Sequence, residues 1–373
     1  MNETINLFDM VPEAGAGYKK PIKSTDWKWS FKDYPPKNGL KVFSCFACGG
    51  GSTMGYKLAG CEVLGCVEID KAMYDLYVTN HHPRFPYNMD IRDFNKIPDD
   101  QLPPELFDLD ILDGSPPCTT FSMAGEREES WGKKKKFREG QKEQTLDDLS
   151  FVFIESAKKL KPMVVIMENV EGLLLGEAFE YVRRIYSDFK EAGYNVWHWL
   201  LKGENMGVPQ TRHRTFFVAI REDLDLNPMD LGMVFNYEPV LYGAFKSVHE
   251  KVAKGKMSAA IKQAHPREKV ADVMRRLYGV NSGLTHRIVR ENEVFPTQTA
   301  GHCDIWTQNG NHPSLEDVLH ATSFPEDYNF LKFQPEYVCG MSVPPVMMKR
   351  VVTKLIEQGV FDYKLKGANH ELD

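Results

Sequence analysis

Short apolar runs bounded by turn residues alternate with stretches of helical periodicity along much of the chain. The pattern predicts strands at residues 40–47 and 63–68. Three further short apolar runs are typical of buried parallel strands, at residues 109–112, 163–167 and 215–220. Apolar side chains recur at helical spacing in residues 53–59, 71–80, 146–160 and 178–191. Because strand and helix alternate, the pattern predicts an α/β fold in which crossover helices connect the strands of a doubly wound, mostly parallel sheet.

The apolar pattern weakens after Arg221 and becomes regular again only near Val343. Residues 223–236, where the change begins, are rich in Asp, Asn, Met and Gly. We therefore predict a small domain, residues 223–315, inserted into a larger one formed by residues 39–222 and 316–373. Residues 1–38 have no clear periodicity, and we expect them to form an N-terminal arm.

The bulk composition is that of an ordinary globular protein. The 373 residues are 42% hydrophobic and 26% charged, with a net charge of −6. The N-terminus lacks a basic region followed by an apolar one, and no apolar run has the length of a membrane span. We therefore expect a cytoplasmic location and no membrane partner.

The cysteines do not indicate a metal or a disulfide framework. Seven is an odd number, and the residues are sparse. Cys45-x-x-Cys48 has the spacing of half a zinc or redox site, but no second pair at metal spacing follows it. We predict no metal and interpret most of the cysteines as buried structural thiols.

Positive charge is concentrated in one segment of this acidic chain. Residues 246–290 contain eleven Lys or Arg and three acids, a formal charge of +8. This is the footprint of a phosphate-contacting surface, although a solvated helix face would produce the same count. Residues 133–136 are four consecutive lysines in a long polar connection, which is typical either of a lid over a phosphate backbone or of a solvated insertion.

Cys118 lies in the most informative stretch, Gly114-Ser115-Pro116-Pro117-Cys118-Thr119. The stretch follows an apolar run that ends at Asp113, which puts the thiol at the carboxyl end of a predicted strand, where α/β sheets place their chemistry. The two prolines fix the backbone ahead of it. The arrangement indicates a nucleophile, because cysteine is the side chain best suited to covalent catalysis near neutral pH.

Two further motifs follow in order, each beside a predicted strand. Glu168-Asn169-Val170 ends one apolar run, where an acid is costly unless it is paired or functional. Gln210-Thr211-Arg212-His213-Arg214 precedes another. One arginine can pair with Glu168 or with a base carbonyl, and the other can brace the loop or a phosphate; the sequence alone leaves this assignment open.

In this order, the motifs resemble the signature of the cytosine-C5 DNA methyltransferases of prokaryotic or phage style. Phe46-Ala47-Cys48-Gly49-Gly50-Gly51 is similar to the family's cofactor loop, Val67-Glu68-Ile69-Asp70 and Asp90-Ile91 to its next two cofactor motifs, and Gly340-Met341-Ser342-Val343 to its closing motif. The resemblance covers roughly residues 40–222 and 293–357. It implies the Rossmann-like fold of class I methyltransferases that use S-adenosylmethionine, with a small target-recognition domain at residues 223–315.

The resemblance also implies the reaction: transfer of a methyl group from S-adenosylmethionine to carbon 5 of a cytosine flipped out of duplex DNA. Addition of the Cys118 thiolate to carbon 6 makes carbon 5 nucleophilic. Glu168 is expected to contact ring N3 and the exocyclic amine, with Arg214 nearer the base and Arg212 structural or shared. The cofactor residues that the family motifs imply are Phe46, Gly49, Gly50, Gly51, Glu68, Ile69, Asp90, Ile91, Pro116, Ser342 and Val343.

Residue chemistry favours this donor over a nicotinamide dinucleotide. Glu68, at the end of the second strand, suits two ribose hydroxyls, Asp90 suits the adenine amine, and Ile91 and Phe46 suit the two faces of the ring. The glycines allow close backbone approach and leave helix N–H groups free, but they do not spell G-x-G-x-x-G.

A flipped base requires a second surface that holds the vacated duplex. We expect phosphate contacts from most of the candidates and guanine readout from any arginine among them. The candidates for DNA contact are Ser122, Lys133, Lys134, Arg267, Arg275, Arg276, Arg287 and Arg290. We also expect the enzyme to be a monomer and to have a cognate restriction endonuclease as a partner.

Four positions depart from the family pattern. Ser44 stands where an acid is common, Cys48 replaces a glycine, Thr119 replaces a glutamine and Met341 replaces an asparagine. Two alternatives stay open: a tRNA cytosine-5 methyltransferase of the same family and a catalytically silent DNA-binding homologue.

Overall fold

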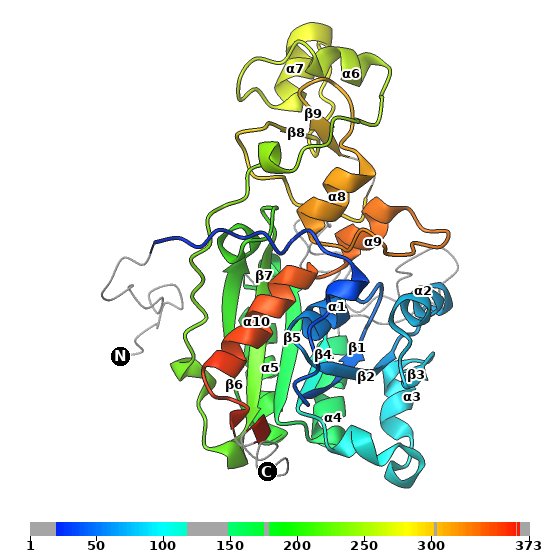
Figure 1. The fold of residues 1–373 in the computed structure, drawn as a ribbon, viewed down its shortest axis with the longest axis vertical. Coiled ribbons are helices and arrows are strands. Elements are labelled where there is room, and N and C mark those ends of the chain that lie inside the picture. The colour runs from blue at the N-terminus through cyan, green and yellow to red at the C-terminus, as the bar shows by residue number, and fades with distance from the viewer. Residues whose placement is uncertain (1–19, 118–147, 175–178, 302–303, 363, 366–373) are drawn as a thin grey trace.

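The computed structural model describes residues 20–117, 148–174, 179–301, 304–362 and 364–365 (Figure 1). Its main feature is a seven-stranded sheet of order β3-β2-β1-β4-β5-β7-β6. The strands are β1 Lys41–Cys45, β2 Glu62–Val67, β3 Phe85–Tyr87, β4 Ile111–Gly114, β5 Val164–Val170, β6 Tyr194–Lys202 and β7 His213–Arg221. The predicted α/β fold with a doubly wound, mostly parallel sheet is confirmed.

β7 differs from the predicted parallel arrangement. It runs antiparallel to both neighbours, β5 and β6, so the interpretation of residues 215–220 as a parallel strand is wrong. The apolar pattern did not reveal β6, because most of its residues are only partly buried. Residues 203–212 connect β6 to β7, and a parallel crossover needs a dozen residues or more, so this short connection returns the chain antiparallel.

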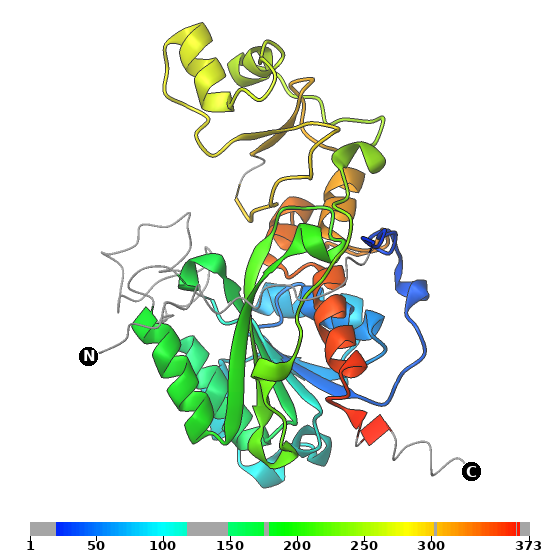
Figure 2. The same ribbon diagram turned by 90° about the vertical axis from the view of Figure 1, so that its left-hand side faces the viewer.

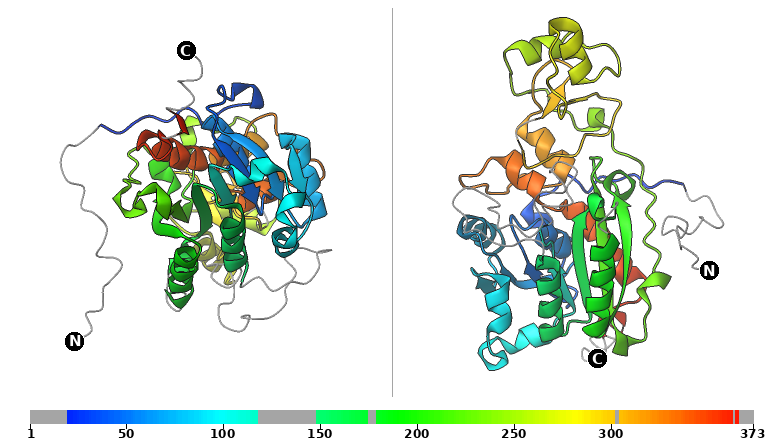
Figure 3. Two further views of the ribbon diagram at one scale, coloured as in Figure 1. Left: turned by 90° about the horizontal axis from the view of Figure 1, so that it is seen from below. Right: turned by 180° about the vertical axis from the view of Figure 1, so that it is seen from behind.

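Helices cover both faces of the sheet (Figure 3). α1 Gly51–Leu58 and α10 Pro345–Glu357 pack on one face, and α3 Ile91–Lys96, α4 Leu149–Leu160 and α5 Phe179–Glu191 pack on the other. β5 contributes to both cores: Val164 and Ile166 face α10, whereas Val165 and Met167 face α4, because successive side chains of a strand point to opposite faces. α2 Lys71–His81 follows β2.

The inserted segment forms one end of the molecule (Figures 1 and 2). α6 Lys256–Ile261, α7 Val270–Tyr278 and the parallel pair β8 Arg287–Val289 and β9 Ile305–Thr307 share an apolar cluster of their own, which includes Val273 and Trp306. α8 Leu315–Thr322 and α9 Pro335–Met341 lie between this cluster and the sheet. Met233, by contrast, joins the core beneath α10. The domain boundaries stay a prediction.

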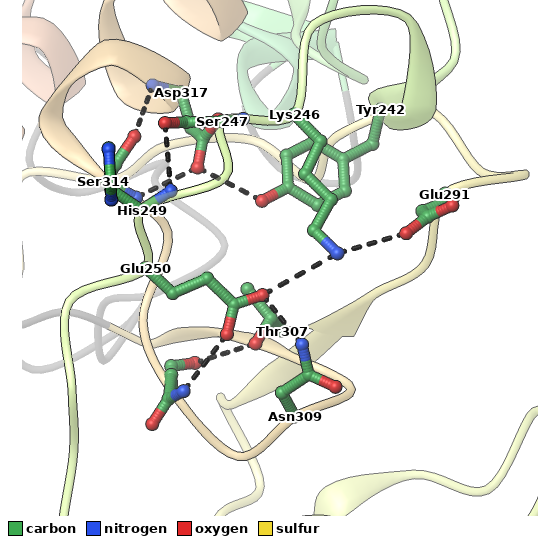
Figure 4. A network of polar contacts seen from close by, with 11 residues as sticks. Tyr242, Lys246, Ser247, His249, Glu250, Glu291, Thr307, Asn309, Ser314 and Asp317 are labelled. Atoms are coloured by element: carbon green, nitrogen blue, oxygen red, sulfur yellow. Dashed lines mark hydrogen bonds and ion pairs between the residues drawn. The ribbon is translucent and has the colours of Figure 1, made fainter.

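A network of polar contacts anchors the inserted segment to α8 (Figure 4). The carboxylate of Asp317 in α8 accepts hydrogen bonds from the Tyr242 hydroxyl (3.1 Å) and the Ser247 backbone N–H (2.7 Å). Farther along, Glu250 accepts hydrogen bonds from the side-chain amides of Asn309 (2.9 Å) and Asn311 (3.0 Å). The network therefore fixes the path of residues 242–250 against residues 309–317.

Candidate active site

A cavity of about 1010 Å³ opens where the parallel strands end. Phe46 follows β1, Glu68 follows β2, Pro116 follows β4 and Glu168 lies near the end of β5; all four line the cavity. Ligands of open α/β sheets bind outside the carboxyl ends of the strands. Residues 296–301 and parts of α9 form an opposite wall, so the cavity lies between the sheet and the inserted segment.

The predicted cofactor residues at the ends of β1 and β2 meet in this cavity. Glu68 is 8% exposed, and its carboxylate accepts the backbone N–H groups of Cys48 (2.9 Å) and Asp70 (2.8 Å), one at each oxygen. Burial raises the pKa of Glu68 to about 7, although these hydrogen bonds act in the opposite direction. Phe46 and Ile69 line the same space.

Asp90 and Ile91 line the cavity at the start of α3. Asp90 caps the helix by accepting the backbone N–H of Arg92 (2.8 Å). The Arg92 guanidinium also bridges Asp90 (3.3 Å) to Asp148 at the start of α4 (2.5 Å). The predicted adenine contact is thus a carboxylate already oriented by a helix end and by an arginine.

The three predicted glycines lie behind the cavity wall rather than in it. A methyl group on Gly49 would lie 2.6 Å from Val338 Cγ1, and one on Gly51 would lie 2.2 Å from the Val343 carbonyl oxygen. At Gly50, whose φ is +77°, it would lie 2.0 Å from His81 Nε2. Glycine is therefore required here for the packing of the loop against distant segments of the chain.

The closing motif meets the glycine loop from the other side. Val343 presents its carbonyl to Gly51, and the Ser342 hydroxyl donates to the Val338 carbonyl (2.8 Å). Neither lines the cavity, whereas the adjacent Gly340 and Met341 do. A role of Ser342 and Val343 toward a cofactor stays a prediction.

Glu168 and Arg214 form a shielded ion pair in the cavity wall. Arg214 Nε lies 3.0 Å from Glu168 Oε1, and the side chains are 17% and 9% exposed. The adjacent Asn169 donates from Nδ2 to the Pro116 carbonyl (3.4 Å), which ties the end of β5 to the loop after β4. Of the two assignments open in the sequence, the structure places Arg214 on the acid.

Arg212 is held elsewhere in the wall. It is 3% exposed and donates from Nη1 to the Gln298 carbonyl (3.0 Å) and from Nη2 to the Gly340 carbonyl (3.1 Å). These contacts join the residue just before β7 to the inserted segment and to α9. Arg212 thus braces the two walls of the cavity against each other.

Cys118, Ser122, Lys133 and Lys134 lie outside the described residues. On this side of the cavity the described chain ends at Pro117, which lines the cavity with Ser115 and Pro116. The predicted nucleophile therefore directly follows a residue of the cavity wall.

Several arginines of the basic segment are engaged within the protein. Arg276 donates to both oxygens of Glu268, each at 2.8 Å. Arg290 lies beside Glu293 (3.4 Å), with 18% of its side chain exposed. A count of charges in the sequence cannot separate such internal pairs from free cations.

The remaining candidates are more accessible. Arg275 contacts Asp272 (3.1 Å) but is 57% exposed, and Arg267 is exposed. Only Arg287, at the start of β8, lines the cavity among these five arginines.

The opposite wall also contains small residues, most of them polar, that no sequence motif indicated. Thr297, Gln298, Thr299, Gly301 and Asp304 line the cavity. Their types carry no distinctive chemistry, and the signal available was their position after Phe295-Pro296, at the return from the inserted segment.

Asp113 explains the departure at Ser44. The two residues are register partners on β4 and β1, and the Ser44 hydroxyl donates to the Asp113 carboxylate (2.7 Å). The Tyr56 hydroxyl of α1 donates to the other oxygen (3.1 Å). The adjacent strand therefore supplies an acid beside the position where the family pattern has one. Burial raises the pKa of Asp113 to about 7, against these hydrogen bonds and with a further contribution from the Glu168 charge.

Comparison with known proteins places the chain in a family. The model of the C-5 cytosine-specific DNA methylase family matches residues 40–301, and the chain belongs to this family. The type II methyltransferase M.FnuDI of Fusobacterium nucleatum is 32% identical over 188 residues, which are 50% of this chain and 49% of the relative. The chain spans about half the length of the curated relatives it matches in this way.

Solved structures have the same fold. A protein described as a DNA modification methyltransferase encoded within an E. coli prophage has a TM-score of 0.59 at 18% identity, with 86% of this chain and 99% of that chain covered. A DNMT2 variant of Spodoptera frugiperda has a TM-score of 0.57 at 16% identity, with 85% and 100% covered. The fold is that of the class I methyltransferases. Among the described residues, no three His, Cys, Asp or Glu gather as a metal site, and no helix is long and apolar enough to cross a membrane.

We predict that Asp113→Asn flattens the pH dependence of stability. The pKa of Asp113 is raised from 3.8 to about 7 in the folded protein, so the folded state holds a proton that the unfolded chain releases. The unfolding free energy therefore falls as pH rises from 3.8 to about 7, by up to about 1.4 kcal/mol per pH unit for this one proton. Urea denaturation of both proteins at several pH values measures the difference. Parallel pH profiles would contradict the assignment.

Proposed function

We propose that this chain transfers a methyl group from S-adenosylmethionine to carbon 5 of a cytosine extruded from duplex DNA. The observation that carries the proposal is the shared cavity. Glu68 from one half of the sheet, the Glu168–Arg214 ion pair from the other half and Pro116-Pro117, directly before Cys118, all line it. Membership of the C-5 cytosine-specific DNA methylase family supports the same reaction.

The cavity residues fit S-adenosylmethionine, which supplies an activated methyl group when bound. Glu68 faces the cavity with a buried carboxylate whose orientation two backbone N–H groups fix, an acceptor suited to ribose hydroxyls. Phe46 and Ile91 offer apolar surface for the adenine ring, and Asp90 offers an acceptor for its amine. A nicotinamide dinucleotide has no comparable support in the residues of this loop.

On the base side, each protein group has a defined task. The Cys118 thiolate forms a bond to carbon 6 of cytosine, and the electron pair displaced through the ring makes carbon 5 nucleophilic. Glu168 stabilises the charge that develops at N3: with a proton on its carboxyl it donates that proton to N3, and the carboxylate that remains pairs with Arg214. Arg214 orients the Glu168 carboxyl, and Arg212 holds the opposite wall in place through its hydrogen bonds to the Gln298 and Gly340 carbonyls. After transfer, loss of the carbon 5 proton returns the electron pair and releases the thiolate.

The opposite wall of the cavity supports duplex DNA as the substrate. A stacked base is out of reach of these groups, so the target nucleotide must leave the duplex. The inserted segment, on the far side of the cavity, is the part of the chain positioned to hold the remaining duplex. Arg287 belongs to this segment and also lines the cavity. An RNA substrate is the alternative to be excluded by offering both nucleic acids.

The biological setting rests on the names of relatives. Curated relatives are called type II methyltransferases, which supports a cognate restriction endonuclease as partner. The monomeric state and the cytoplasmic location stay predictions from the sequence.

Cys118→Ala is expected to abolish methyl transfer while leaving binding of duplex DNA intact, because the thiolate is required for bond making and not for holding the duplex. Incorporation of labelled methyl groups into mixed-sequence DNA and a parallel binding titration measure the two properties. Cys61→Ala is the matched control, since Cys61 is buried just before β2, at the opposite edge of the sheet. Turnover by the Cys118 variant would exclude the covalent route.

Arg287→Ala is expected to weaken duplex binding and to reduce the slope of log affinity against log salt by about 0.9, the value for one lost phosphate contact. Arg183→Ala is the control, because Arg183 is an exposed arginine of α5 paired with Glu180. An unchanged affinity would mean that the surface that binds DNA does not include Arg287 of β8. A relaxed sequence preference with an unchanged salt slope would assign Arg287 to a base instead.

A further inference from the structure

The loop after β1 has an unfavourable backbone. Phe46, Cys48 and Gly50 have φ values of +57°, +45° and +77°, so alternate residues of residues 46–50 lie in the left-handed region. Only glycine adopts this region without cost, and a bulky residue such as Phe46 rarely does. Such a backbone persists only where its surroundings hold it in place.

The shape of this loop defines the predicted cofactor side of the cavity. Phe46 and Cys48 line the cavity, and the Cys48 backbone N–H donates to Glu68 Oε2 (2.9 Å). The Cys48 N–H lies in the peptide plane between residues 47 and 48, so a change in that plane would remove one of the two hydrogen bonds that orient the Glu68 carboxylate.

Two side chains from distant segments hold the peptide between Gly49 and Gly50, two peptide planes farther along the same loop. The Gly49 carbonyl accepts the Tyr328 hydroxyl (2.6 Å) and lies 3.2 Å from His81 Nε2. A carbonyl only accepts, so His81 carries its proton on Nε2. Burial lowers the pKa of His81 to about 3, which keeps the ring neutral. The His81 ring also fills the space that a side chain at residue 50 would need.

We propose that Tyr328 and His81 are positioning residues for the cofactor: by donating to the Gly49 carbonyl from two distant segments of the chain, they form a clamp that holds the left-handed loop that orients Glu68. The inference rests on the proposed function for the identity of the ligand. The clamp itself is a property of the protein alone.

The N-terminal arm completes the clamp. The Phe31 ring lies 6.2 Å from the Tyr328 ring and 6.3 Å from the His81 ring, centroid to centroid. The Phe31 backbone N–H donates to Asp327 (3.0 Å), and the Trp29 indole donates to the Ser323 carbonyl (2.8 Å). The arm lies outside the span that the family model matches, residues 40–301.

Tyr328→Phe tests the clamp by removing one hydroxyl while the ring keeps its contacts with Phe324 and Phe330. We expect roughly ten-fold weaker binding of S-adenosylmethionine by calorimetry, as loss of one buried hydrogen bond allows, with duplex binding unchanged. KM for the donor should rise while kcat is retained. In the ligand-free protein, amide hydrogen exchange of the peptide covering residues 46–50 should accelerate.

Tyr194→Phe is the matched control, because Tyr194 is also buried and donates to the Pro162 carbonyl (2.8 Å) away from the cavity. His81→Gln keeps a side-chain N–H group that can donate to the Gly49 carbonyl, so this variant should bind S-adenosylmethionine nearly as tightly as the wild type does. His81→Leu has no such group and should bind it more weakly. If Tyr328→Phe matches Tyr194→Phe in both affinity and exchange, the clamp is wrong. If the wild type binds no S-adenosylmethionine, the proposed function fails, and the exchange comparison alone decides the clamp.

Discussion

The pairing of Glu168 with Arg214 depends on the direction of β7 and in turn organises the cavity. A shielded carboxylate at the end of β5 needs a cation, and leaving one partner of such a pair alone costs on the order of 3–5 kcal/mol. Arg214 is available because β7 runs antiparallel and therefore begins at the edge where β5 ends, with Arg214 opposite Val170 in register. A parallel β7 would carry Arg214 to the opposite edge. The same reversal brings Arg212 to the carbonyls of Gln298 and Gly340, so one strand direction connects the acid, the inserted segment and α9.

The alternation of apolar runs predicted the central parallel strands, because buried parallel strands read as continuous apolar stretches. β1, β2, β4 and β5 and their helices lie close to the predicted ranges. β6 was not predicted, because an edge strand with partly buried residues gives no such stretch. Without β6, the antiparallel direction of β7 could not be inferred. β3 is short, and none of its residues is fully buried.

For the site, motifs that end strands could be placed from sequence, because the ends of parallel strands meet at one edge. Glu68, Pro116 and Glu168 are examples. The packing role of Gly49 could not be predicted, since its partner Tyr328 lies 279 residues away in the sequence, Val338 lies farther still, and only the fold brings them together. Likewise, arginine type predicted positive charge but not the pairing of Arg276 with Glu268. Two departures from the family pattern can be related to the structure. Ser44 hydrogen-bonds the Asp113 carboxylate, and Cys48 lies in the left-handed loop that Tyr328 and His81 contact.

Covalent capture tests the central claim most directly. A duplex carrying 5-fluorocytosine would be incubated with the protein and S-adenosylmethionine, followed by a denaturing gel and peptide mass mapping. Fluorine at carbon 5 cannot leave as a proton does, so the bond to carbon 6 should persist and map to Cys118. A duplex that binds without forming any adduct, or an adduct at another residue, would contradict the account.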